Sequence, residues 1–348
     1  LQPVLALSPF ALSFTIFIGA VTAIGASLIV IAQVDVKRAL SYSVSAYMGL
    51  VFVAVGTGQT QAALLLVFTH AVAMALLVMS TGGVVWNSIT QDLRLYGGLW
   101  SRRPISGISF LIGAAGLIAL PPLGGFWALL QLADGLWITQ PWLVGVVLVT
   151  NALTAFSVTR VFCLMFGNKP KPMTVRSPEV HWPMILPMTI LLGFVMHVPL
   201  VLQSLSILPE WAYINKDVAL LLVWSTISGC SISAVVYLSP LVPKPVALPW
   251  KPLQDFFAYD LYTANLYRVT IVFGVAVISR LIALIDRYLV DGIVNLVGLV
   301  SIFGGETLKY STSGHFQFYA LTILLGVCCL GAIVGWPLLS HMELSFSF

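Results

Sequence analysis

The stretch Ile118-Ala-Leu-Pro-Pro-Leu-Gly-Gly-Phe126 lies in the middle of an uncharged apolar run that covers residues 105–133. As a single helix that run would be about 44 Å long, whereas the hydrocarbon core of a membrane is roughly 30 Å thick. Prolines lack an N–H group and clash with the preceding turn, and glycines add backbone freedom. The residues expected to break the helix are Pro121, Pro122, Gly124 and Gly125.

Broken backbone at membrane depth must be buried in protein or line a cavity. Discontinuous helices of this kind mark ion and substrate pathways in transporters. We therefore expect the backbone groups of residues 121–125 to face a polar cavity. The alternative is a plain tight turn between two spans at one membrane face.

The composition indicates an all-α polytopic membrane protein. Of the 348 residues, 59% are hydrophobic and only 8% are charged, whereas soluble domains carry about 25% charged residues. The net charge of +4 is spread over short loops without a basic run, so we expect no nucleic-acid partner. The four cysteines lie in apolar stretches without CxxC spacing, which indicates neither a metal site nor a disulfide framework. Because the first residue is Leu1, we expect the later part of a longer protein.

Hydropathy divides the chain into four regions. Residues 1–240 are expected to form a bundle of about eight transmembrane spans, interrupted at 121–125. Residues 241–254 are proline-containing and predict a linker, 255–312 predict a lateral amphipathic helix, and 313–348 predict a terminal span. The lateral helix is inferred from one polar helical face, with apolar residues opposite; a tilted span with snorkelling ends is the alternative. That polar face consists of Arg280, Arg287, Asp291 and Asn295.

A charged knot, defined as residues 33–38 (Gln-Val-Asp-Val-Lys-Arg), separates the first two spans. Asp35 and Arg38 are spaced to pair across one helical turn. Lys37 is a candidate for a proton path, or it simply pairs with Asp35 at an interface. His70, in the middle of the third span, is a second candidate because imidazole exchanges protons near neutral pH. A buried structural histidine is the alternative for His70.

Four stretches together carry a family resemblance. They are residues 33–43 (QVDVKRALSYS), 69–77 (THAVAMALL), 119–126 (ALPPLGGF) and 290–319, which ends in GHFQFY. In this order the first three resemble the antiporter-like membrane subunits of respiratory complex I and its photosynthetic relatives. The fourth resembles the subunit 5 family of chloroplast and cyanobacterial NAD(P)H–quinone oxidoreductase. The resemblance covers nearly the whole chain and corresponds to the later half of the family.

The resemblance implies the complex I antiporter-like fold, with a second inverted repeat that contains a discontinuous helix. It implies proton movement along a polar axis, with Asp35, Lys37 and His70 as candidates, in a thylakoid membrane. No cofactor is expected in this chain, because plastoquinone and the iron–sulfur clusters belong to other subunits. The expected partners are neighbouring antiporter-like subunits of the membrane arm, and lipids.

Two departures from the family pattern put the usual proton path in doubt. Met74 stands where the family's T-H-A-x-x-K helix has its lysine, and Leu129 stands where the discontinuous helix has another. Neither side chain can hold a proton. We expect Met74, Phe126 and Leu129 to form a dry section. Such losses resemble the variant of subunit 5 from cyanobacterial carbon dioxide-uptake complexes, which has a hydrophilic carbonic-anhydrase-like partner.

Two other functions remain open at this point. One is an ordinary proton-pumping subunit 5 of the respiratory or cyclic-electron-flow complex, which lysines at positions 74 and 129 would have favoured. The other is a subunit of a multi-subunit cation–proton antiporter, against which the lateral helix counts.

Overall fold

The computed structural model describes residues 8–239, 251–311 and 314–343. They belong to two compact units, one ending at Thr263 and the other beginning at Ala264. Within these ranges the regular structure is helical, apart from one isolated bridge between Asp35 and Asp92. The predicted all-α class is therefore confirmed.

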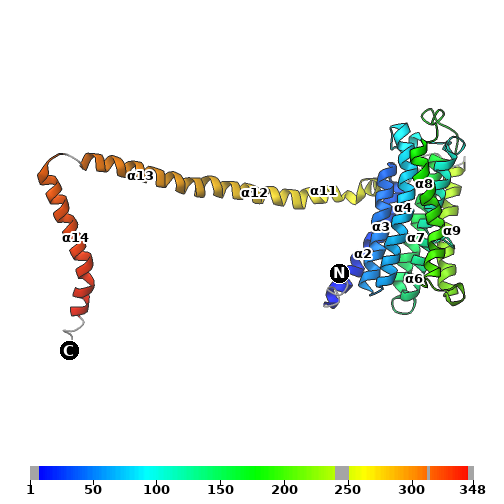
Figure 1. The fold of residues 1–348 in the computed structure, drawn as a ribbon, viewed down its shortest axis with the longest axis horizontal. Coiled ribbons are helices and arrows are strands. Elements are labelled where there is room, and N and C mark those ends of the chain that lie inside the picture. The colour runs from blue at the N-terminus through cyan, green and yellow to red at the C-terminus, as the bar shows by residue number, and fades with distance from the viewer. Residues whose placement is uncertain (1–7, 240–250, 312–313, 344–348) are drawn as a thin grey trace. The chain divides into compact units, whose positions relative to one another are not determined.

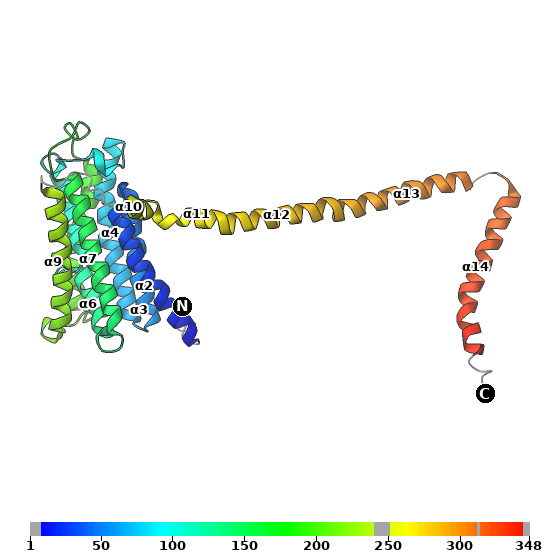
Figure 2. The ribbon, with the colours of Figure 1, turned by 180° about the vertical axis from the view of Figure 1, so that it is seen from behind.

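The first unit contains a bundle of eight helices that lie side by side (Figures 1 and 2). Six of them are long and apolar enough to cross a membrane, whereas α5 and α6 have only 14 residues each, about 21 Å. The bounds are α2 (Pro9–Ala32), α3 (Val36–Gly56), α4 (Thr60–Ser88), α5 (Pro104–Leu117), α6 (Gly124–Trp137), α7 (Pro141–Met165), α8 (Trp182–Ser204) and α9 (Lys216–Leu238).

Helices α5 and α6 are the two halves of the run that was expected to break. Ile118 and Leu123 are extended, and Pro121 and Pro122 lie between them in the non-helical segment. Gly124 and Gly125, which were expected within the break, instead form the first turn of α6. A side chain at Gly125 would come within 2.6 Å of the Leu117 carbonyl oxygen, so glycine allows α6 to start against the end of α5.

Close packing between α2 and α3 brings the charged knot to one end of the bundle. A Cβ atom at Gly19 would lie 2.7 Å from the carbonyl oxygen of Gly49, and one at Gly49 would lie 2.5 Å from the backbone nitrogen of Ala23. Small residues at helix crossings let backbones approach closely in membrane proteins. The two helices are therefore held in a fixed register on either side of residues 33–35.

The segment that follows α4 is fixed by the loop between α7 and α8. Arg103 is fully buried and donates to the Ser177 hydroxyl (2.9 Å) and the Gly83 carbonyl (3.0 Å). Burial lowers the pKa of Arg103, and the charge of Glu179 opposes this shift. Glu179 also accepts from the Ile105 N–H group at the start of α5 (2.9 Å). These bonds fix the end of the segment 89–103, which forms part of the site described below.

The second unit has α11 (Thr263–Tyr267, which begins at the boundary), α12 (Phe273–Ile285), α13 (Asp291–Ser311) and α14 (Phe316–Glu343). π-Helical turns, Arg268–Val272 and Asp286–Val290, connect the first three. The apolar stretch Asp260–Tyr310 has 51 residues, or about 75 Å as a helix, far more than a bilayer needs. A lateral position along the membrane remains a prediction.

The lateral region departs from the sequence prediction in two respects. The boundary expected between the linker 241–254 and the lateral helix 255–312 falls inside a separate helix, α10 (Lys251–Ala258). This helix packs against α2 (Figure 2). Residues 240–250 and 312–313 lie outside the described residues. The predicted polar face assumed a continuous α-helix. The π-helical turn 286–290 changes the helical register between Arg280 and Asp291, so the spacing used for that prediction does not hold across the turn.

Candidate functional site at the helix break and the charged knot

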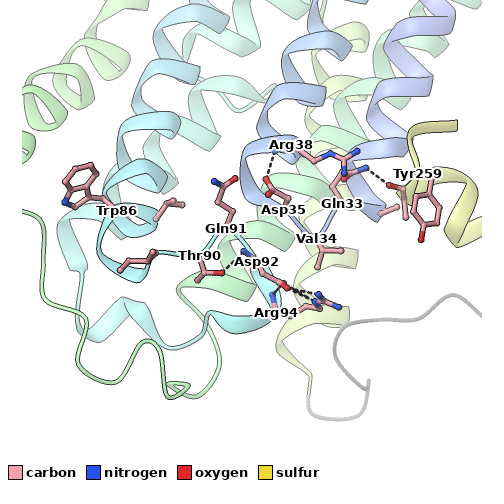
Figure 3. Close-up of a pocket in the computed structure, with 14 residues that line it drawn as sticks. Gln33, Val34, Asp35, Arg38, Trp86, Thr90, Gln91, Asp92, Arg94 and Tyr259 are labelled. Atoms are coloured by element: carbon pink, nitrogen blue, oxygen red, sulfur yellow. Dashed lines mark hydrogen bonds and ion pairs between the residues drawn. The ribbon is translucent and has the colours of Figure 1, made fainter. Parts of the chain in front are cut away.

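The charged knot borders a cavity of about 1080 Å³ at the end of the bundle (Figure 3). The backbone of the knot is joined to the segment after α4 through Val36 N–H to the Gln91 carbonyl (3.0 Å) and Leu93 N–H to the Val34 carbonyl (2.8 Å). The third wall comes from α10 and the residue that follows it. The lining comprises Ala32, Gln33, Val34, Asp35, Arg38, Val85, Trp86, Ile89, Thr90, Gln91, Asp92, Arg94, Ala258 and Tyr259.

The charges around this cavity are largely neutralised. Arg94 forms an ion pair with Asp92 (2.7 Å), and its hydrogen bond lowers the pKa of that carboxyl group. Arg38 forms an ion pair with Asp260. The predicted Asp35–Arg38 side-chain pair is wrong: Asp35 caps α3 by accepting from the backbone N–H of Arg38 (2.9 Å). The cavity therefore has little excess charge.

Lys37 and Met74 line one groove between α3 and α4, of about 260 Å³. Its other lining residues are mostly apolar, with Ser41 and Thr81 as the hydroxyl groups. The Lys37 side chain is exposed and has no ion pair among the described residues. The structure thus places one proton-path candidate beside a position where the family pattern has a lysine and this chain has a thioether.

His70 is buried and stacks on Tyr47 of α3, with ring centroids 4.5 Å apart. Neither ring nitrogen of His70 has a hydrogen-bond partner within the described residues. The Tyr47 hydroxyl donates to the Leu117 carbonyl at the end of α5. His70 is therefore next to a residue that contacts the helix break, which is consistent with either of the two roles considered for it.

The break is closed by side chains from three other helices. Asn151 of α7 accepts from the Ala119 N–H group (3.0 Å), and Thr226 of α9 donates to the Ala119 carbonyl (3.1 Å). Asn151 also donates to Ser225 (2.7 Å) and Thr226 (2.8 Å). With Tyr47 on the Leu117 carbonyl, the polar backbone here is buried in protein. The expectation of a polar cavity concerned residues 121–125 and stays a prediction there, whereas the backbone groups of Leu117 and Ala119 are bound by side chains.

Met74, Phe126 and Leu129 all lie in the main hydrophobic core, with exposed fractions of 7%, 1% and 0%. Helix α6 approaches α4 closely at its start, since a Cβ atom at Gly124 would lie 2.9 Å from a Thr69 methyl group. Phe126 also stacks on Trp211 of the loop before α9, at 5.9 Å between centroids. The surroundings of Phe126 and Leu129 are thus apolar, whereas Met74 also borders the groove that contains Lys37.

Sequence reasoning missed Tyr47, Asn151 and Thr226 as residues that hold the break. The available signal was weak: Asn151 is a strongly polar side chain within an apolar span, and such residues often bond across helices in membranes. Its partner 32 residues away could not be deduced from spacing. No cluster of three or more potential metal ligands occurs among the described side chains.

Comparison with known proteins identifies the relatives of this chain. Residues 1–154 match the family described as NADH:quinone oxidoreductase/Mrp antiporter, TM. The chromatophore NAD(P)H-quinone oxidoreductase subunit 5 (copy 2) of Paulinella chromatophora is 40% identical over 336 residues, which cover 97% of this chain and 54% of that protein. The chain is a homologue of NAD(P)H-quinone oxidoreductase subunit 5.

More distant homologues of subunit 5 agree. The chloroplast protein of Nephroselmis olivacea is 28% identical, over 98% of this chain and 56% of its own length. Chain 5 of a Picosynechococcus species is also 28% identical, over 97% of this chain and 57% of its own length. The chain spans about half the length of the curated relatives it matches. The resemblance inferred from sequence motifs, and with it the antiporter-like fold, is confirmed.

Proposed function

We propose that this subunit 5 homologue works in the membrane arm of a photosynthetic complex I, a ferredoxin- or NAD(P)H-driven plastoquinone oxidoreductase of the thylakoid membrane. The names of the relatives, which are quinone oxidoreductase subunits, and the antiporter description of the matching family support a role in coupling quinone reduction to proton movement. Plastoquinone and the iron–sulfur clusters would be held by other subunits, because electrons need not pass through this chain.

The observation that supports a specialised function is the burial of Met74 and Leu129 at lysine positions of the family pattern. A lysine amine can exchange a proton, since burial moves its pKa toward neutrality. A thioether or an isobutyl group cannot do so at any pH. This later half of the subunit would therefore lack the usual lysine relay.

A dry apolar section suits the uptake of carbon dioxide. An ion that enters such a section incurs a desolvation cost of several kcal/mol, whereas a small neutral molecule does not. Met74, Phe126 and Leu129 would exclude protons and admit the gas. Hydration to bicarbonate would take place on a hydrophilic, carbonic-anhydrase-like partner protein.

A second candidate is the ordinary proton-pumping subunit 5. It is favoured by His70, which is buried without a hydrogen-bond partner among the described residues, next to Tyr47 and the helix break. In that case His70 would exchange protons with water that enters beside α4.

The two candidates differ in the composition of the native complex. We expect that the complex purified from membranes through a tag on this chain contains the carbonic-anhydrase-like protein. The measurement is mass spectrometry of all its subunits, with a complex tagged on an unrelated membrane subunit as the control. A complete complex that lacks any such protein, and pumps protons on quinone reduction, would favour the second candidate.

A further inference from the structure

Two side chains of the charged knot bind a residue more than two hundred positions away. The Gln33 amide donates to one carboxylate oxygen of Asp260 (2.9 Å), and the Arg38 guanidinium forms an ion pair with the other. The Gln33 amide also lies 3.4 Å from the Ala258 carbonyl at the end of α10. Figure 3 shows Gln33 and Arg38 beside Tyr259 of this segment. Both oxygens of one carboxylate are thus held by two residues of one motif.

The backbone at Asp260 has an unusual conformation. Asp260, Leu261 and Tyr262 have φ values of 58°, 57° and 54°, so three consecutive residues other than glycine are left-handed. Positive φ is unfavourable for residues other than glycine, and less so for aspartate than for leucine or tyrosine. The turn persists only where surrounding contacts outweigh this cost.

The segment lies at the surface of the first unit, where α10 packs against α2. No residue of α10, or of the turn Asp260–Tyr262, is buried. The Thr263 hydroxyl donates to the Asp260 carbonyl (2.8 Å), a bond within the turn itself. The two bonds from the charged knot, together with the hydrogen bond between Tyr42 of α3 and Asp260, join this surface segment to the bundle.

We propose that Gln33 and Arg38 form an anchoring site for Asp260, which holds residues 251–263 against the bundle in a strained left-handed turn. The chain continues from this turn into α11. The charged knot thus has a positioning role distinct from any role of Lys37 in proton movement. This inference does not depend on whether the complex takes up carbon dioxide.

Amide hydrogen exchange of residues 251–263 in the purified complex tests the anchor. Asp260→Asn should raise the exchange rate of this segment about tenfold or more, because hydrogen bonds to a charged group are lost. Asparagine tolerates positive φ as well as aspartate does, so the loosening cannot come from backbone preference. Arg38→Gln should act in the same direction. Asp255→Asn, at an exposed carboxylate of α10, is the matched control and should leave exchange unchanged.

A second variant tests the strain. Glycine normally loosens a segment, but Leu261→Gly should leave exchange at or below the wild-type rate, because glycine adopts positive φ without cost. The charge-swapped pair Arg38→Asp with Asp260→Arg should recover part of the protection lost in either single variant. Wild-type exchange in Asp260→Asn, or no recovery in the swapped pair, would overturn the anchor. Faster exchange in Leu261→Gly would overturn the strained turn.

Discussion

Cells that carry Met74→Lys together with Leu129→Lys should lose most of their carbon dioxide uptake, about tenfold or more, while electron transfer to quinone changes little. The two lysines would place amines in a section that is now apolar, and each amine would draw water toward it. The new amine at position 74 would lie one helical turn after His70, close enough for the two groups to interact. The measurement is uptake in intact cells, with quinone reduction measured in parallel.

Two controls separate the chemistry from assembly. Met74→Leu with Leu129→Met keeps both positions apolar at similar volume and should cost less than about 1.5 kcal/mol of stability, so uptake should remain. The amount of assembled complex must be equal in all strains. Undiminished uptake in the double lysine variant, with normal assembly, would contradict the proposal that carbon dioxide passes through the dry section. The absence of lysines at positions 74 and 129 would then reflect a proton path that is no longer used.

Asn151→Leu should lower the free energy of unfolding of the bundle by about 3 kcal/mol, the second-largest effect that we expect. The variant removes the acceptor for the Ala119 N–H group and two donors toward α9. The N–H group would be left buried in an apolar region where water cannot replace the lost partner. Chemical denaturation of the purified protein in detergent micelles gives the difference.

Thr150→Val is the matched control for Asn151→Leu. Thr150 is the preceding residue, fully buried, and its hydroxyl has no hydrogen-bond partner within the described residues. Removing an unsatisfied hydroxyl should leave stability unchanged or raise it slightly. If Asn151→Leu were no more destabilising than Thr150→Val, the side-chain network would not be what holds the break.

The helices of the bundle could be predicted from sequence because each is set by a local property. Apolar runs of membrane length are read directly, and Pro121 with Pro122 forces the end of a helix wherever it occurs. The start of α6 at Gly124 could not be predicted, because it depends on the close approach of Gly125 to the Leu117 carbonyl. From sequence alone, two adjacent glycines predict that the helix breaks, whereas in the structure they permit close packing at the start of α6.

Contacts between residues far apart in the sequence could not be predicted from sequence spacing. Arg38 was expected to bind Asp35, its neighbour by helical spacing, but the guanidinium binds Asp260 instead. Asp35 is occupied as a helix cap, a role that its position before α3 could have indicated. Likewise, the polar residues of the spans offered no way to tell that Tyr47, Asn151 and Thr226 converge on one break.

Reaction of a cysteine at position 129 with a small water-soluble thiol reagent tests the central claim, a dry section at Leu129, most directly. The background would have the native cysteines Cys163, Cys230, Cys328 and Cys329 replaced, and Ser41→Cys, exposed on the groove beside Lys37, would be the reference. Thiols react as thiolates, which form only where water reaches them. Leu129→Cys should stay unreacted in the assembled complex while Ser41→Cys reacts. Reaction at position 129 at a rate close to that of position 41 would show water in the section and contradict the account.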